Sequence, residues 1–295
     1  MNKPFLHYIL TGIIFSILWS SASIAGKFGL LSVEPLVLFT VRFILAGVVM
    51  LLYAHGLKKS RIPSGKEWKH LIIFGAFNTA LYLGIFIIAL QYITAGLTVL
   101  AIALNPLFIS LMTSIWSKAK VSAAVWLSIA LGIAGVFIAS YPLLNAQEMT
   151  TAGLLLLALS MVAYSFGSVY YSSVKWHLDR VTINGWQVLI GGILIMPFAF
   201  LFHSQHNQLD LRFWLSLMWL VVPVSIMAVQ LWLILLKEDA IRASFWLYLC
   251  PIFGLIFSAI LLAEPLSWYT FFGTVLVLGA LFMGQRKKLS LKRGN

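Results

Sequence analysis

Apolar residues occupy most of this chain in long blocks, and short polar or charged gaps separate the blocks. A helix needs about 20 mostly apolar residues to cross about 30 Å of hydrocarbon, and ten blocks approach or reach that length. Only a few residues separate the third block from the fourth, so one very long helix is an alternative there. The pattern predicts an all-α integral membrane protein with ten transmembrane helices, at residues 7–26, 36–55, 68–90, 93–116, 121–141, 151–173, 182–203, 213–236, 241–263 and 267–285.

The composition supports a membrane protein. Of 295 residues, 61% are hydrophobic and 9% charged, whereas soluble proteins have about 45–50% apolar and about 25% charged residues. These values exclude a soluble enzyme, a disordered protein and a nucleic-acid-binding domain. The net charge of +12 could indicate nucleic acid, but the basic residues lie between the apolar blocks, where membrane topology places them. We therefore expect a lipid bilayer, and no nucleic acid, as partner.

The lysines and arginines also predict the orientation, because they concentrate on the cytoplasmic side of membrane proteins. With a cytoplasmic N-terminus and alternating sides, seventeen of the twenty lie inside, Lys27 and Arg212 lie outside, and Arg42 falls within a helix. The chain is therefore expected to be a multi-pass protein of the cell (inner) membrane with both termini cytoplasmic. The first block, up to Trp19 and the small residues after it, also resembles a signal peptide, but a matching segment at mid-chain favours a retained helix.

The two halves of the chain match each other when the sequence is shifted by 145 residues. Proline is scarce, 9 of 295 residues, yet Pro106 coincides with Pro251. Apolar sequences also match by chance, which is the alternative explanation for the other pairs: Ser20 with Ser165, Ser23 with Ser168, Trp19 with Tyr164, Arg42 with Gln187 and Gly47 with Gly192. The shift predicts repeats at 1–145 and 146–285 and a basic cytoplasmic tail at 286–295. Five helices per repeat make the second copy inverted, as is typical of secondary transporters.

The same residues carry a resemblance to a known family. Trp19-x3-Ser23-x3-Lys27, followed by Pro35 and Arg42, is similar to the opening helix pair of the EamA-type branch of the drug/metabolite transporter superfamily. The closing motifs are similar as well: Leu249-Cys250-Pro251, Ala263-Glu264-Pro265-Leu266 and Gly273-x5-Gly279. The resemblance covers about residues 7–285 and implies ten helices in two inverted repeats that export or exchange small metabolites. Ala119-Lys120 replaces the second repeat's Glu264-Pro265, which argues against any role that needs symmetric charges.

Polar side chains within the blocks are the candidate substrate-binding residues. Ser16, Ser20, Ser23 and Lys27 share one face of the first helix, and Ser160, Tyr164, Ser168 and Ser172 share one face of the sixth. Small hydroxyl residues also let membrane helices pack closely, so these stripes indicate either packing or a polar cavity with aromatic walls. The predicted binding residues are Trp19, Ser20, Ser23, Asn78, Tyr82, Thr98, Asn105, Tyr164, Ser168 and Trp246.

Five further residues are expected to be structural or gating: Arg42, Pro106, Gln187, Pro251 and Glu264. An arginine at mid-helix costs roughly 2.5–3.5 kcal/mol on insertion scales. Arg42 could therefore extend toward the outer surface, hold carbonyls of neighbouring helices, or bind an anionic group of the substrate. Glu264 precedes a proline, where helices commonly end. It is either a solvated helix end or a gating contact.

The chemistry that is missing narrows the function. The sequence has no His-x3-His or Cys-x2-Cys pair, no nucleophile elbow and no phosphate loop, so we expect no enzyme activity, no metal and no cofactor. All eight acids lie in loops or at helix ends, which favours a facilitator or solute exchanger over a proton-coupled pump. We expect a small-molecule substrate, such as amino acids or similar amphipathic metabolites, moved by alternating access. The alternatives are an exporter of lipophilic drugs or cations, and a membrane receptor or structural subunit that transports nothing; the oligomeric state stays open.

Overall fold

The computed structural model describes residues 3–89, 102–117, 121–141, 150–203, 207–262 and 267–286, and the regular structure in these residues is helical throughout. Ten helical segments follow the ten apolar blocks. The first half contains α1 (Lys3–Leu30), α2 with the π-helical turn η1 (Pro35–Leu51, Leu52–Leu57), α3–η2–α4 (Lys66–Gly75, Ala76–Leu81, Tyr82–Ala89), α6 (Asn105–Ser117) and α7 (Ala123–Ser140). The second half contains α8 (Thr151–Ser173), α9 (Arg180–Leu201), α10–η4–α11 (Leu211–Trp219, Leu220–Ala228, Val229–Glu238), α12–η5–α13 (Ala240–Ser244, Phe245–Tyr248, Leu249–Leu262) and α14 (Trp268–Arg286).

The polar gaps start the helices, because the first turn of a helix leaves backbone N–H groups without partners. Asp179 accepts hydrogen bonds from the N–H groups of Val181 and Thr182, and Asp210 accepts one from that of Phe213. Pro35, which has no N–H to satisfy, stands at the start of α2. The charged residues of the gaps thus close helix ends at the surfaces where a membrane would meet water.

Six helices of the described residues are long and apolar enough to cross a membrane: Phe5–Leu30, Pro35–Leu57, Lys66–Phe86, Thr151–Ser173, Arg180–Leu201 and Leu211–Glu238. Shorter apolar helices cover Ala123–Ala139, Ala240–Gly254 and Trp268–Gly284. Many large apolar side chains point outward; Leu155, Phe200 and Leu215, for example, are each more than 60% exposed. An outer surface of this kind is suited to lipid rather than to water. The expected class, an all-α membrane protein, is confirmed.

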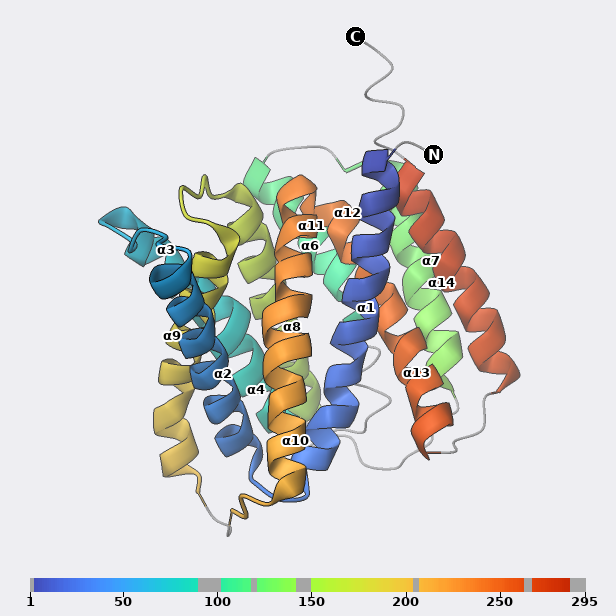
Figure 1. The fold of residues 1–295 in the computed structure, drawn as a ribbon. Helices are drawn as coiled ribbons and strands as arrows, with labels where there is room; N and C mark the ends of the chain where they lie inside the picture. The colour runs from blue at the N-terminus through green and yellow to red at the C-terminus, as the bar shows by residue number, and fades with distance from the viewer. Residues whose placement is uncertain are drawn as a thin grey trace.

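The internal repeat is visible in the boundaries and in the packing of the helices. Helices α2 and α9, α3 and α10, and α7 and α14 each begin 145 residues apart. Helix α2 packs along α9, and α7 packs along α14, so each pair joins equivalent helices of the two halves (Figure 1). Helix α1 packs against α13 and against α10–η4–α11, and its equivalent α8 packs against α6 and against α3–η2–α4. Exchanging the halves therefore reproduces the packing. Helix α1 begins and α14 ends at the same end of the bundle (Figure 1), and the expected pair of inverted five-helix repeats is confirmed.

Glycines permit close contacts between the equivalent helices of both pairs. A Cβ atom added at Gly47 of α2 would lie 2.6 Å from the Cβ of Leu189 on α9. Gly135 of α7 and Gly273 of α14 face each other in the same manner, since a Cβ on either would collide with the other's carbonyl oxygen. Small residues at such crossings let helix backbones approach and gain van der Waals contact, which stabilises membrane helix pairs.

Equivalent membrane segments also depart from regular α-helix at equivalent places. The π-helical η2 and η4 interrupt the third segment of each repeat, and η4 contains Pro223. A turn at Leu104 precedes Pro106 at the start of α6, and the 3₁₀ turn η5 precedes Pro251 in α13. Proline provides no N–H for the preceding turn, which gives the departures at Pro106, Pro223 and Pro251 a local cause; η2 contains no proline. Interrupted helices near the middle of the membrane are typical of transporters.

Candidate functional site

A network of buried polar side chains links the second, third, seventh and eighth membrane segments. Gln187 on α9 is completely buried. Its Oε1 accepts hydrogen bonds from Thr79 Oγ1 at 2.7 Å and Asn78 Nδ2 at 3.4 Å, and its Nε2 donates to Asn184 Oδ1 at 2.9 Å. Asn184 Nδ2 in turn donates to the backbone oxygen of Ser225 at 3.0 Å. The network therefore fixes η2 and η4 against α9.

Arg42 completes this network from α2. Its side chain is only 5% exposed, and its Nε donates to Ser225 Oγ at 2.8 Å. The guanidinium carbon lies 5.4 and 5.0 Å from the ring centroids of Phe39 and Phe43. Arg42 is also close enough to the Tyr82 phenol for an electrostatic interaction. The side chain therefore remains inside the protein instead of reaching the outer surface, and it bonds to a hydroxyl group instead of a carbonyl.

The described residues place no carboxylate beside Arg42. Their ion pairs are Lys58–Asp179, Arg61–Glu67 and His203–Glu34, which lie in the gaps and at helix ends. The Arg61 side chain donates hydrogen bonds to Glu67 and lowers the pKa of that carboxyl to about 2. These acids balance charge at the surface, and they leave the buried cation of Arg42 without a counter-ion in the described part of the chain.

An aromatic cluster lies beside the polar network; we use this name for Phe15, Trp19, Tyr82, Tyr164 and Trp232. Tyr164 is at its centre, with ring centroids 4.7 Å from Tyr82, 5.9 Å from Trp232 and 6.3 Å from Trp19. Phe15 stacks on Trp232 at 5.0 Å. These rings come from α1, α4, α8 and α11, so equivalent helices of both repeats contribute.

Two polar groups of the aromatic cluster have no hydrogen-bond partner among the described residues: the hydroxyl of Tyr164 and the Nε1–H of Trp232. Both side chains are at most 2% exposed. Buried polar groups of tyrosine and tryptophan normally find a partner, because leaving them unpaired costs free energy. Such groups can bind a polar ligand. Trp232 is absent from the sequence-based set of candidates, although a tryptophan in the middle of an apolar block, away from the interfacial belt, is a usable signal.

The serine stripes form bonds within their own helices. Ser20 Oγ donates to the backbone oxygen of Ser16, and Ser168 Oγ donates to that of Tyr164 at 2.9 Å. Ser16 Oγ reaches the neighbouring segment, where it donates to the oxygen of Trp246 at 2.9 Å. These contacts support helix packing. The side chain of Ser23 is not described, and Thr98 and Glu264 lie outside the described residues.

The two remaining binding candidates, Asn105 and Trp246, join neighbouring helices. Asn105 connects α6 to α8, because its Oδ1 accepts from Ser165 Oγ at 3.1 Å and its Nδ2 lies 3.3 Å from Met161 Sδ. Trp246 on η5 lies 6.1 Å from Tyr8, centroid to centroid, and its indole occupies the space that a side chain at Gly12 would fill. Helix α1 is thus closely packed against η5 near the end of the bundle where α1 begins.

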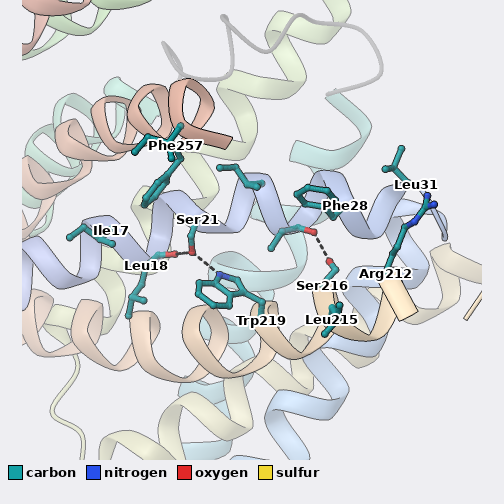
Figure 2. A pocket seen from close by; sticks show the side chains of 13 residues that line it. Ile17, Leu18, Ser21, Phe28, Leu31, Arg212, Leu215, Ser216, Trp219 and Phe257 are labelled. Atoms are coloured by element: carbon teal, nitrogen blue, oxygen red, sulfur yellow. Dashed lines mark hydrogen bonds between the residues drawn. The ribbon is translucent and has the colours of Figure 1, made fainter. Parts of the chain in front are cut away.

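A pocket of about 950 Å³ lies toward the opposite end, between α1, α10 and α13 (Figure 2). Its wall is apolar except for Ser21 and Ser216, with Arg212 beside Leu31; the other lining residues are Ile17, Leu18, Ile24, Ala25, Phe28, Leu215, Trp219, Phe257 and Ile260. Trp219 Nε1 donates to Ser21 Oγ at 2.9 Å across the pocket wall (Figure 2). Leu18 lines the pocket while its neighbour Trp19 joins the aromatic cluster, so α1 separates the two features.

The described part of the chain contains no candidate metal site, because no three His, Cys, Asp or Glu side chains lie together there. The ionisable residue within the buried network is Arg42, a cation. The site can therefore bind, orient and release a solute through donors and aromatic faces.

Ten helices in two inverted repeats, with polar and aromatic residues where the repeats meet, define the class of inverted-repeat membrane transporters. The chain belongs to the EamA-like transporter family, whose model matches residues 6–141 and again 151–284. An uncharacterized transporter of Synechocystis is 28% identical, covering 93% of this chain and 89% of its own. Protein PecM of Dickeya dadantii is 25% identical over 88% of this chain and 86% of its own.

Two further comparisons support the fold and the family. The Escherichia coli protein named probable amino-acid metabolite efflux pump is 24% identical, over 95% of this chain and 96% of its own. A crystal structure described only as that of a protein has a TM-score of 0.81 at 20% identity, covering 98% of this chain and 99% of that one. The family resemblance expected from the motifs is thus confirmed along nearly the whole chain.

Proposed function

We propose that the protein is an inner-membrane secondary transporter that exports or exchanges small metabolites, amino acids or similar amphipathic solutes, by alternating access. One observation carries the proposal: Arg42, Asn78, Tyr164 and Trp232, from both repeats, bring buried polar groups and aromatic faces to the interface between the repeats. Substrate sites of inverted-repeat transporters lie at such interfaces, near the middle of the membrane.

An amino acid suits the groups that are available. The unpartnered Tyr164 hydroxyl and Trp232 Nε1–H are donors for a carboxylate, and the buried Asn78 Oδ1, also without a partner in the described residues, is an acceptor for an ammonium group. The rings of the aromatic cluster can cover the apolar part of the solute. The printed name of the Escherichia coli relative points to the same class.

The two ends of the bundle differ in packing, as an alternating-access mechanism requires. Helix α1 packs closely on η5 at the end where it begins, whereas the pocket between α1, α10 and α13 lies toward the other end. With the orientation that the basic residues predict, the described conformation is closed on the cytoplasmic side. In the opposite state, the contact between α1 and η5 would open and the equivalent contact of the other repeat would close at the opposite end, because the repeats are inverted copies.

Solute exchange is the proposed mode of energy coupling. The six acids in the described residues lie in gaps or at helix ends. Coupling to protons generally uses an ionisable carboxylate within the membrane. A transporter without one moves its solute down the solute's own gradient or exchanges it for another.

Counterflow in proteoliposomes tests the function. Vesicles loaded with an unlabelled amino acid should transiently accumulate the labelled compound, at equal pH on both sides and with a protonophore present. Glu264→Gln should retain this exchange. Saturable counterflow excludes a receptor or structural subunit. Absence of counterflow across the whole amino-acid panel, or uphill transport driven by a pH gradient alone, would contradict the proposal.

The apolar pocket favours a second candidate function, the export of lipophilic solutes. Its walls offer mainly aliphatic and aromatic surface, and apolar pockets with a few polar groups bind lipophilic molecules. Leu215→Asn places an amide in the pocket. Two results together would support this second function. The wild type would export a lipophilic dye but show no amino-acid counterflow, and the Leu215→Asn variant would lose the dye efflux.

A further inference from the structure

We infer that Arg42 is the residue that binds an anionic group of the solute, so that the site selects molecules carrying a carboxylate. The inference rests on the proposed function in one respect, namely that the bound anion is part of the transported solute.

Among the described residues, the charge of Arg42 meets the aromatic rings of Phe39 and Phe43 but no carboxylate. Its side chain is 95% buried, and the described residues provide it with no carboxylate. A charge removed from water without a partner is strongly destabilising, and such residues within membranes commonly belong to substrate or ion pathways. An anionic solute would supply the missing counter-charge each time the site is loaded.

The guanidinium of Arg42 has donors that no described residue uses. In the described residues, its hydrogen bond is the one from Nε to Ser225 Oγ, and the two terminal nitrogens have none. Ser225 is itself fixed, because its backbone oxygen accepts from Asn184 Nδ2. One bond thus orients the planar group, while the pair of terminal nitrogens retains the fork geometry that matches a carboxylate.

The neighbouring free groups are mostly donors too. Tyr82, within electrostatic reach of Arg42, contacts the ring of Tyr164 at 4.7 Å between centroids, and the Tyr164 hydroxyl has no partner among the described residues. Trp232, whose ring stacks with that of Tyr164, has an Nε1–H that can only donate and that has no partner among the described residues. A cation with added donors favours an anion over a cation, because a cationic solute would face repulsion and few acceptors.

Gln187, the equivalent residue of the second repeat, shows what a purely structural residue at this place looks like. Its amide uses both ends, accepting from Thr79 and donating to Asn184. Arg42 uses one of its three nitrogens. The spare capacity of Arg42 is therefore a property of this residue and not of its position in the repeat.

The test compares an acid with its matched amide. Purified protein is titrated by calorimetry, at fixed ionic strength, with 3-phenylpropanoate and 3-phenylpropanamide, and then with phenylalanine and phenylalaninamide. Wild type should bind each acid at least about tenfold more tightly than its amide, as expected for a charge-assisted bidentate contact. Arg42→Gln should abolish this ratio, and Arg42→Lys should keep only part of it. Arg61→Gln, which changes a surface arginine paired with Glu67 and away from both the network and the pocket, is the matched control and should leave the ratio unchanged.

The wild-type ratio decides the matter even if Arg42→Gln does not fold. Equal binding of acid and amide, no acid binding at all, or a ratio preserved in folded Arg42→Gln would overturn the inference. If the inference fails in one of these ways, counterflow of an amide would still support the proposed transport function. Acid-selective binding without any counterflow would instead support the anion site and remove the proposed function.

Discussion

Arg42 and Gln187 occupy equivalent positions in the two repeats, yet they have different neighbours. Gln187 uses both ends of its amide, in bonds to Thr79, Asn78 and Asn184, whereas Arg42 has one hydrogen bond to the described residues, to Ser225. In lipid, a polar side chain that loses its partner cannot turn to water. The hydrogen bonds of a buried amide such as Gln187 therefore contribute to the stability of the bundle.

Gln187→Leu should lower the free energy of unfolding by about 1–2 kcal/mol, because it leaves Thr79 Oγ1 and Asn184 Oδ1 unpaired while the volume hardly changes. Thermal unfolding in detergent measures this effect. Gln230→Leu is the control. It removes one exposed bond, to the oxygen of Arg180, and should change stability by less than about 0.5 kcal/mol. Equal losses in the two variants would contradict the importance of the network.

Asp179 at the start of α9 predicts a pH dependence. Burial raises the pKa of its carboxyl, but hydrogen bonds from Ser60 and Thr182, together with Lys58, outweigh burial and lower the pKa to about 2. A lowered pKa means that the charged form stabilises the fold above the ordinary value near 4, and that this stability is lost as the pH falls through about 2. Asp179→Asn should therefore melt at a lower temperature than wild type at pH 6, with a difference that shrinks between pH 4 and pH 2. A pH-independent difference would show that the charge is unimportant.

At the scale of the helices, glycines permit close contacts between equivalent helices, and prolines accompany some of the places where helices are interrupted. The pair α7–α14 closes one side of the bundle (Figure 1), and it can do so because Gly135 and Gly273 bring the two backbones together. The interruptions before Pro106 and Pro251 recur at equivalent places in both repeats. Packing and interruption thus repeat with the sequence.

Gly273→Ala should destabilise the α7–α14 pair, since the new methyl group would collide with the backbone of α7. Gly279→Ala, one and a half turns further along the same helix, has open space around it and should be neutral or stabilising by up to about 1 kcal/mol, because alanine is the better helix former. Melting temperatures of the two variants, compared with wild type, distinguish packing from helix propensity. A loss of stability in both would point to propensity or to lipid contacts instead.

The whole molecule combines the two repeats into a bundle whose two ends differ. Trp246 occupies the place left free by Gly12 at one end, and the apolar pocket lies toward the other. This asymmetry between chemically similar halves is what alternating access requires. Which end faces the cytoplasm follows from the basic residues and is therefore a prediction about topology.

Single cysteines test this topology. The chain has one cysteine, Cys250, which is buried, so a membrane-impermeant thiol reagent should not label the wild-type protein. In a Cys250→Ser background, Lys59→Cys should react only after the cells are permeabilised, whereas Asn207→Cys should react in intact cells. The reverse pattern would place the N-terminus outside and invert the assigned closed side.

The sequence by itself determined the helices, their number and their duplication. The bilayer imposes a length on every apolar block, so segments such as Thr151–Ser173 can be found without any knowledge of their neighbours. The repeat boundaries follow from the same pattern, because equivalent helices of inverted copies need equivalent lengths and starts.

Only the tertiary structure decided which polar residues meet. Arg42 reaches Ser225, 183 residues away, because α2 and η4 pack together, and no local pattern specifies which helix faces which. The serines of α1 and α8 show the converse. Their spacing suggested a shared polar face, yet Ser20 and Ser168 turn back to carbonyls of their own helices, the nearest acceptors that a hydroxyl has in a dry interior. The same holds for Trp232 in the aromatic cluster. Its neighbours depend on how whole helices cross and not on the residues beside it in the chain.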